Sequence, residues 1–191
     1  MSNQFQDISN FVKLEIPESH KIPIAIIGAG GIVDGAHLPA YKKAGLEIVG
    51  ITDVDQDRAK DVASRHGIPM VYPDLATLLK ESDAQVIDIA VPPAAQKDIF
   101  IEVAKSGRHI LAQKPLATNV ADGEQMIKVA KAAGVIAVVN QQLRFEEGIA
   151  AAYKMVDLGW IGEVTSISIT VNLATPWEMF PWAKNMDKLE I

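Results

Sequence analysis

The chain has 191 residues, of which 49% are hydrophobic, and its 18 basic and 24 acidic residues give a formal net charge of −6. This length suits one full domain with a small appendage, and the acidic balance without any basic cluster argues against a nucleic-acid partner. No stretch reaches the roughly 18 unbroken apolar residues of a membrane span, and the absence of cysteine excludes disulfides, thiolate zinc sites and cysteine nucleophiles.

The first residues, 1–21, are polar and acidic, and they lack the basic region and apolar run of a signal peptide. We expect them to form the N-terminal extension of a cytoplasmic protein. Beyond them, short β-branched runs bounded by turn-forming residues predict strands. The predicted strands are Ile24–Ile27, Glu47–Thr52, Met70–Tyr72, Val86–Val91, His109–Ala112 and Ile136–Val139.

Longer amphipathic stretches lie between these runs, and several end at a glycine, a usual stop signal for a helix. The predicted helices are Ile32–Ala44, Gln56–His66, Leu75–Lys80, Asp98–Lys105 and Val120–Ala133. Strands that alternate with helices of about a dozen residues indicate βαβ units and a parallel sheet. With right-handed crossovers, residues 22–143 are predicted to form an α/β domain, a doubly wound parallel sheet of the Rossmann type.

The pattern changes after Asn140. Phe145–Leu158 predicts a helix, and Glu163–Asn172 alternates apolar and polar residues, which is typical of a strand with one solvated face. One strand leaves its backbone groups unpaired, so a segment that pairs with it is missing. We therefore expect residues 144–191 to begin an incomplete α+β second domain, in a truncated gene product or in a longer protein of which this chain is a part.

The segment Gly28-Ala-Gly-Gly-Ile-Val leads from the first predicted strand into a predicted helix. Such a turn gathers backbone N–H groups and the positive end of a helix at one point, which favours a pyrophosphate. Gly28 allows the tight turn and Gly30 allows phosphates to approach the backbone, whereas Val33 stands where a third glycine usually eases helix–strand packing. Taken alone, the glycines fit an ordinary turn equally well, and no Lys-Ser or Lys-Thr pair makes them a Walker A loop.

An acidic residue follows the second predicted strand. Asp53 lies 22 residues after Gly31, close to the spacing of about 20 for a ribose-binding acid. Its carboxylate would accept both hydroxyls of the adenosine ribose and repel a 2′-phosphate, which favours NAD over NADP. Arg58 would soften that preference, so NADP stays an alternative. In the other interpretation, Asp53 or Asp55 is the N-cap of the next helix.

Two further motifs follow predicted strands, at the edge where open α/β sheets bind their ligands. Pro92-Pro93 follows the fourth strand, and Gln113-Lys114-Pro115 follows the fifth. Lys114 is the only charge at the end of its strand, where it would donate to a substrate oxygen or exchange a proton with it. The alternative is a solvated surface lysine that precedes a helix.

Taken in order, these motifs resemble those of the Gfo/Idh/MocA oxidoreductases, a family that includes glucose–fructose oxidoreductase and inositol dehydrogenases. The resemblance covers the chain from about Ile24 to Gly162. It rests on the glycine segment, Ala36-His-Leu-Pro-Ala40, Asp53, Val91-Pro92-Pro93, Gly107-Arg-His-Ile-Leu-Ala-Gln-Lys-Pro-Leu-Ala117, Arg144-Phe145 and Gly159-Trp-Ile-Gly162. The ordered series is far more specific than any single motif.

The resemblance implies a role for each matching position. Cofactor-binding candidates at the nucleotide end are Gly28, Gly30, Gly31 and Ile32 for the pyrophosphate, and Asp53 with Arg58 for the ribose. Those on the nicotinamide side are Val91, Pro92, Pro93, Gln96, Gln113 and Lys114. Lys114 would also be the catalytic lysine, which bridges the nicotinamide ribose and the substrate hydroxyl. Arg144 and Trp177 are further substrate-binding candidates, although a structural ion pair explains Arg144 equally well, and no metal is expected.

Some positions depart from the family's pattern. Gln113 stands where the family usually has Glu, and Gln96 stands where many members carry His. Both changes keep hydrogen bonding and remove a titratable group. The family's acid and base partners of the lysine come from its second domain, so every histidine here is expected to be structural or solvent-exposed. These histidines are His20, His37, His66 and His109.

The resemblance implies an enzyme that transfers a hydride between NAD(P) and a CH–OH group of a sugar, an inositol or a related polyol. It also implies a homo-oligomer formed through the second domain. The alternative is a non-catalytic cofactor-binding regulator or assembly subunit of the same fold, which the two glutamines, Gln96 and Gln113, make reasonable.

Overall fold

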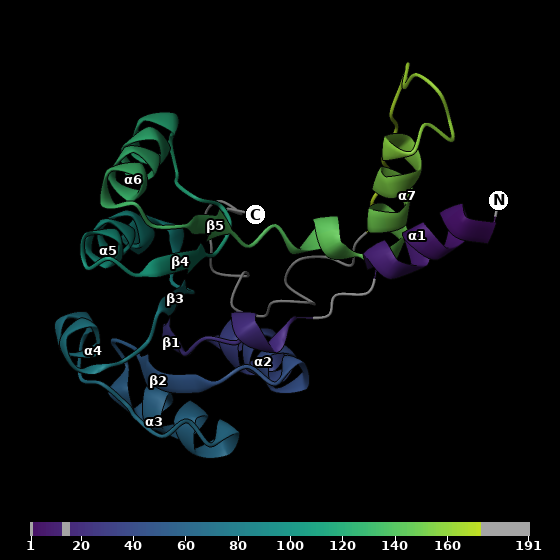
Figure 1. The fold of residues 1–191 in the computed structure, drawn as a ribbon. Helices are drawn as coiled ribbons and strands as arrows, with labels where there is room; N and C mark the ends of the chain where they lie inside the picture. The colour runs from purple at the N-terminus through teal and green to yellow at the C-terminus, as the bar shows by residue number, and fades with distance from the viewer. Residues whose placement is uncertain (1, 13–15, 173–191) are drawn as a thin grey trace. The chain divides into compact units, whose positions relative to one another are not determined.

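The computed structural model describes residues 2–12 and 16–172 (Figure 1). Contacts divide the described residues into two units: residues 16–143 contain the sheet, and residues 2–12 group with residues 144–172. The predicted division into residues 1–21, 22–143 and 144–191 stays a proposal. None of the described helices is long and apolar enough to cross a membrane.

Five parallel strands form one sheet in the larger unit, in the spatial order β2-β1-β3-β4-β5. The strands are β1 Ile24–Ile27, β2 Ile48–Thr52, β3 Val86–Ile89, β4 His109–Ala112 and β5 Ala137–Val139. Their carboxyl ends are aligned, since Ile27 pairs with Ile89, and Ile89 pairs with Ala112. The strand order reverses between β1 and β3, and open sheets bind ligands beyond the carboxyl ends at such a point. The predicted doubly wound α/β sheet is confirmed.

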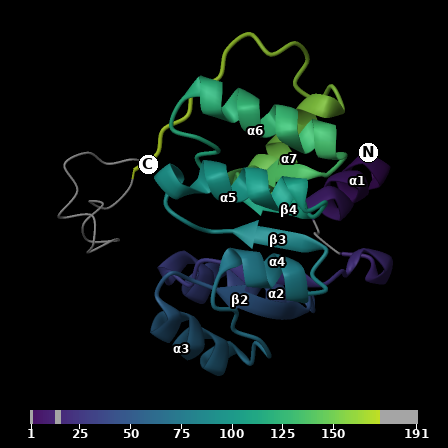
Figure 2. The same ribbon diagram turned by 90° about the vertical axis from the view of Figure 1, so that its left-hand side faces the viewer.

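Helices cover both faces of this sheet, and Figure 2 looks onto the face covered by α4, α5 and α6. The helices are α2 Leu38–Ala44 and α3 Gln56–His66 on one face, and α4 Leu75–Glu81, α5 Pro93–Lys105 and α6 Val120–Ala133 on the other. Successive residues of β1 serve different faces: Ile26 packs in a cluster with Val62, whereas Ile27 packs in a cluster with Phe100 and Met126. Burial on both faces explains why β1 is apolar throughout.

The third predicted strand, Met70–Tyr72, is wrong. Val71 makes only an isolated parallel bridge with Ile51, through hydrogen bonds from Ile51 N to the Met70 carbonyl (3.0 Å) and from Tyr72 N to the Ile51 carbonyl (2.9 Å). Pro73, which follows, has no N–H to continue a ladder. Asp74 then caps α4 by accepting the N–H of Thr77 at 2.7 Å, so the extended segment is too short to be a strand.

One helix begins earlier than predicted, and another contains an irregular segment. The predicted helix Ile32–Ala44 is helical from Gly31 and contains a π-helical segment, η2 Val33–His37, directly before α2. The helix predicted over Asp98–Lys105 begins five positions earlier, as α5 at Pro93, because the fixed φ of proline suits the first helical position. Its earlier start brings Gln96 onto a helix that faces the carboxyl edge of the sheet.

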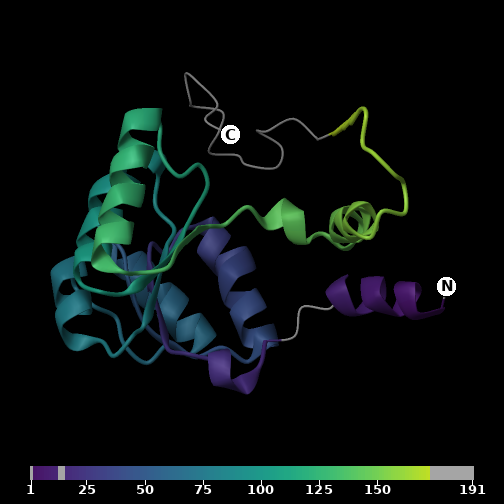
Figure 3. The ribbon, with the colours of Figure 1, turned by 45° about the horizontal axis from the view of Figure 1, so that its top comes forward.

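The smaller unit contains α1 Ser2–Val12 and α7 Glu147–Asp157, which lie side by side in Figures 1 and 3. The rings of Phe11 and Tyr153 stack with their centroids 6.0 Å apart. The ammonium of Lys154 lies 5.6 Å from the centroid of Phe11. The expected N-terminal extension therefore includes a helix that packs on α7, and it also includes the 3-10 turn η1 Glu18–His20.

The strand predicted over Glu163–Asn172 is wrong for the described structure, in which this segment forms neither helix nor strand. The side chains of Ile167 and Ile169 are 77% and 80% exposed. A strand is defined by its partner, and none of the described residues pairs with this segment. The alternation of apolar and polar residues therefore does not lead to a strand here. Trp177 lies outside the described residues.

Candidate functional site

The glycine turn begins where β1 ends. Gly28 has a φ of +105°, and a Cβ on it would lie 2.3 Å from the carbonyl oxygen of Ala90. Its N–H donates to the Thr52 carbonyl at 2.8 Å. Gly30 and Gly31 differ, because a Cβ on either would meet nothing within 4 Å. Gly28 is therefore required by the fold, whereas Gly30 and Gly31 leave open backbone of the kind that a phosphate approaches.

The chain turns into a helix directly after these glycines. The carbonyl of Gly30 accepts the N–H of Val33 at 3.0 Å and the N–H of Asp34 at 3.1 Å. Ile32 remains exposed beside the turn, while Val33 is fully buried in the core cluster of Ile26. Valine at the third glycine position thus serves helix–sheet packing, and the open backbone at the helix start is unaffected.

Asp53 ties the end of β2 to the glycine turn. Its Oδ2 accepts the N–H of Ala29 at 2.6 Å. Its Oδ1 accepts the N–H of Asp55 at 2.8 Å and a guanidinium N–H of Arg58 at 2.7 Å. Burial raises the pKa of Asp53, but the hydrogen bonds from Arg58, Asp55 and Ala29 outweigh it and hold the pKa below its ordinary value. Asp53 is thus a fixed carboxylate beside the turn.

The N-cap alternative is settled by the start of α3. Asp55, which precedes the helix, accepts the N–H of Arg58 with its side chain at 3.1 Å. Asp55 is therefore the cap, and Asp53 is left to face the glycine turn. The role of Asp53 at the adenosine ribose stays a prediction.

Lys114 lies just beyond β4, in a loop held by backbone and side-chain hydrogen bonds. Gln113 donates its N–H to the Ile89 carbonyl at 2.9 Å, and its Oε1 accepts the N–H of Lys114 at 2.7 Å. The peptide bond from Lys114 to Pro115 is cis. Within the described part of the chain, the ammonium of Lys114 has no hydrogen-bond or ion-pair partner. Its backbone is fixed while its charge stays available to a ligand.

Gln96 supports the same loop from α5. Its side chain is 1% exposed. Its Nε2 lies 2.9 Å from the carbonyl oxygens of Gln113 and Pro115 and 2.8 Å from that of Leu116. Gln96 therefore holds the backbone on both sides of Lys114, and a direct contact of its amide with a cofactor stays a prediction.

The turn after β3 lies between these two parts of the site. Ala90 donates its N–H to the Ile27 carbonyl at 2.8 Å, which joins this turn to the end of β1. Val91 follows, Pro92 is the N-cap of α5, and Pro93 is its first residue. The fold therefore brings the predicted residues of the larger unit to one edge of the sheet. They are Gly28, Gly30, Gly31, Ile32, Asp53, Arg58, Val91, Pro92, Pro93, Gln96, Gln113 and Lys114.

Arg144 belongs to the smaller unit, in the 3-10 turn η3 Gln142–Phe145, where its guanidinium lies 5.4 Å from the ring centroid of Phe145.

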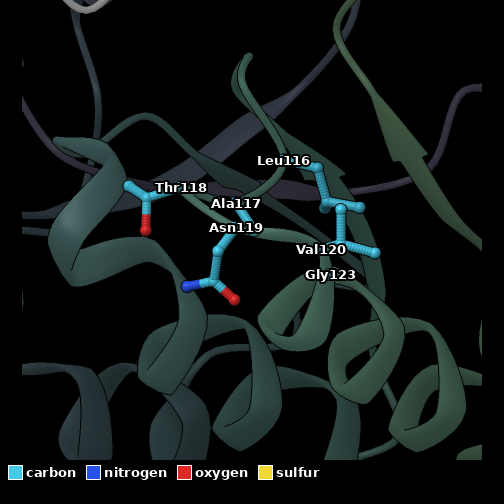
Figure 4. A pocket seen from close by; sticks show the side chains of 6 residues that line it. All are labelled: Leu116, Ala117, Thr118, Asn119, Val120 and Gly123. Carbon is cyan, nitrogen blue, oxygen red and sulfur yellow. The ribbon is translucent and has the colours of Figure 1, made fainter.

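A separate open hollow lies between the Lys114 loop and the start of α6 (Figure 4). It is lined by Leu116, Ala117, Thr118, Asn119, Val120 and Gly123. None of the predicted site residues lines it, so we do not assign the cofactor to it. No cluster of three metal-ligating side chains occurs among residues 2–12 and 16–172.

Sequence reasoning missed a buried polar cluster next to this loop. His37, which was expected to be structural or solvent-exposed, is buried with its Nδ1 2.7 Å from Oδ2 of Asp88 in β3. Tyr41 donates its hydroxyl to the same oxygen at 2.8 Å. The Nε2 of His37 lies 3.3 Å from the side-chain amides of Gln113 and Asn140. The signal available in the sequence was Asp88 itself, a charge in the middle of an apolar strand.

Comparison with known proteins supports the fold of the larger unit. The family model for the oxidoreductase family with an NAD-binding Rossmann fold, GFO_IDH_MocA, matches residues 22–141. D-apiose dehydrogenase from Paraburkholderia graminis is 30% identical over 72% of this chain and 37% of its own length. Myo-inositol 2-dehydrogenase from Thermotoga maritima is 28% identical over 77% of this chain and 44% of its own length. The chain thus spans about two fifths of these relatives.

A solved structure shares the same architecture. The WlbA dehydrogenase from Bordetella pertussis, in complex with NADH and UDP-GlcNAcA, is 29% identical with a TM-score of 0.68. The match covers 74% of this chain and 43% of that protein.

Proposed function

Because the chain belongs to the Gfo/Idh/MocA oxidoreductase family with an NAD-binding Rossmann fold, we propose that it binds NAD(P) at the carboxyl edge of its sheet. We further propose that it takes part in hydride transfer to or from a CH–OH group of a small molecule. One observation carries the proposal: the open backbone of Gly30 and Gly31 lies next to the fixed carboxylate of Asp53.

The nucleotide end of the proposed site fits a dinucleotide. Gly30 and Gly31 leave space where a Cβ would stand, so the pyrophosphate can approach backbone N–H groups at the positive end of a helix. Asp53 keeps its charge and would accept the ribose hydroxyls. We propose NAD as the preferred cofactor, because this carboxylate would repel a 2′-phosphate. NADP stays the alternative, since Arg58 pairs with Asp53 and is half-exposed, which would let its guanidinium turn to a phosphate.

The reacting end of the proposed site centres on Lys114. Bound nicotinamide would supply the hydride acceptor or donor. Lys114 would hold the substrate oxygen and exchange its proton, as a general acid or base. The turn Val91-Pro92-Pro93 would line the nicotinamide side. Arg144 and Trp177 stay candidates for substrate contact.

We propose a sugar, an inositol or a related polyol as the substrate. The support is the likeness to D-apiose dehydrogenase and myo-inositol 2-dehydrogenase. A homo-oligomer formed through the second domain is part of the same proposal. The second candidate function is a non-catalytic cofactor-binding regulator or assembly subunit. It is favoured by the uncharged amides of Gln96 and Gln113, whose groups are engaged in holding the loop.

A substrate screen separates the two candidates. The full-length protein is incubated with NAD⁺ and a panel of pentoses, hexoses and inositols, and formation of NADH is followed by absorbance. We expect NADH to form with at least one compound that carries a secondary alcohol, because Lys114 in its proposed role would take up the hydroxyl proton. Samples without substrate and samples with NADP⁺ are the controls. Saturable NADH binding with no turnover on any compound would favour the regulator.

A further inference from the structure

The central strand β3 carries one charged side chain at a fully buried position. Asp88 is 0% exposed, and an unpaired carboxylate there would be strongly destabilising. Its Oδ2 accepts hydrogen bonds from His37 and Tyr41. Burial, followed by the charge of Asp88 and the hydrogen bond to it, raises the pKa of Tyr41 above its ordinary range. The phenol therefore keeps its proton and donates a hydrogen bond to Asp88.

The direction of the hydrogen bonds beyond His37 follows from the backbone. The N–H of Lys114 can only donate, so the side-chain oxygen of Gln113, 2.7 Å away, is the acceptor. The amide nitrogen of Gln113 then faces the Nε2 of His37 at 3.3 Å. An amide nitrogen offers only hydrogens, which makes the Nε2 of His37 an acceptor. The imidazole proton is therefore on Nδ1, where it faces Asp88 at 2.7 Å.

These contacts form one chain of donors that runs from the backbone of Lys114 through Gln113 and His37 to Asp88. Asn140, just past β5, joins it through its own amide nitrogen, 3.3 Å from the Nε2 of His37. His37 is the last residue of η2, the segment that follows the glycine turn. One imidazole thus links the helix of the glycine turn to the segments that leave β4 and β5.

We propose that His37, held by Asp88 in the neutral tautomer with its proton on Nδ1, is a positioning residue for Lys114. It orients the amide of Gln113, which in turn fixes the backbone N–H of Lys114. The role of His37 in catalysis rests on the proposed function of Lys114, but the tautomer and the hydrogen-bond direction do not. The side chains that face His37 are those of Asp88, Tyr41, Gln113 and Asn140.

Residue 113 sets the charge of this imidazole. An amide at position 113 donates to the Nε2 of His37 and suits a neutral ring. A carboxylate in its place could only accept, so His37 would have to carry a proton on both nitrogens, between that carboxylate and Asp88. The variant Gln113→Glu is therefore expected to convert His37 into an imidazolium. The side chain at position 113 thus determines whether the imidazole of His37, close to Lys114, is neutral or positively charged.

The protonation of His37 is measured by nitrogen-15 NMR of the full chain near neutral pH, without cofactor. We expect one protonated and one unprotonated ring nitrogen in the natural protein, with the proton on Nδ1, and two protonated nitrogens in Gln113→Glu. His20, which is exposed in η1, is the internal reference and should be alike in both proteins. A proton on the Nε2 of His37 in the natural protein, or a neutral ring in Gln113→Glu, would overturn the proposal.

The positioning role is measured in the enzyme assay with His37→Phe. Loss of the acceptor frees the Gln113 amide, and we expect kcat to fall by about 10- to 100-fold while the affinity for NADH changes little. The control is His66→Phe, because His66 binds Asp34 outside the cluster and its variant should keep the natural kcat. An unchanged kcat in His37→Phe refutes the positioning role. If the natural protein shows no turnover, the proposed function fails, and the NMR result still decides the tautomer.

Discussion

Replacing Lys114 by alanine is expected to lower kcat for oxidation of the proposed sugar or polyol substrate by about 10²- to 10⁴-fold. This is the usual contribution of a positioned general acid or base. The loop holds the backbone of Lys114 through Gln113, while its ammonium is without a partner among the described residues. The variant removes the group that would exchange the proton and leaves the nucleotide end intact. NADH affinity, measured by fluorescence titration, should therefore change much less than kcat.

Two further variants sharpen this test. Lys114→Arg keeps the positive charge, but a guanidinium does not release its proton in proteins, so its kcat should fall nearly as far. Lys128→Ala removes an exposed lysine of α6 and should leave kcat unchanged. The assignment of Lys114 fails if Lys114→Ala keeps the natural kcat, or if its loss appears only in KM.

Gly28→Ala is expected to lower the free energy of unfolding by about 2–4 kcal/mol, from an unfavourable φ together with overpacking. Gly28 has a φ of +105°, and a Cβ there would lie 2.3 Å from the carbonyl oxygen of Ala90. That oxygen belongs to the backbone between β3 and α5, which cannot give way as a flexible side chain would. Chemical denaturation followed by circular dichroism measures the loss.

Gly30→Ala is the matched control for this variant. A Cβ on Gly30 meets no atom within 4 Å, so the free energy of unfolding should change by less than about 1 kcal/mol. The same Cβ would occupy the space proposed for the pyrophosphate, and the affinity for NADH should fall. Equal stability losses in Gly28→Ala and Gly30→Ala would contradict the distinct roles of the two glycines.

The sheet was predictable because each of its strands is an apolar run bounded by turn residues. The five strands observed were all expected, and the helices that end at Gly45, Gly67 and Gly134 stop there with left-handed caps. The predictions failed where pairing decides the structure. Met70–Tyr72 has β-forming residues, but Pro73 and the cap of α4 limit it to one bridge. Glu163–Asn172 has the right alternation and no partner among the described residues.

The candidate site was predictable where function depends on position along the chain. The glycines and Asp53 are recognised by their distance from strand ends. The structure brings them together through the hydrogen bond from the N–H of Ala29 to the carboxylate of Asp53. The hydrogen bonds that hold the Lys114 loop were not predictable. His37 and Asp88 are 51 positions apart, and only the parallel sheet places η2 over the middle of β3. Gln96 likewise gains its role because α5 begins earlier than the periodicity indicates.

We propose above all that this chain binds NAD at the glycine turn, with Asp53 on the adenosine ribose. Titration of the purified chain with NADH and with NADPH, followed by fluorescence, tests it most directly. We predict saturable binding of NADH that is tighter than that of NADPH, because the carboxylate of Asp53 accepts ribose hydroxyls and repels a 2′-phosphate. Equal or tighter binding of NADPH would contradict the role of Asp53, and the absence of saturable binding of either dinucleotide would contradict the site itself.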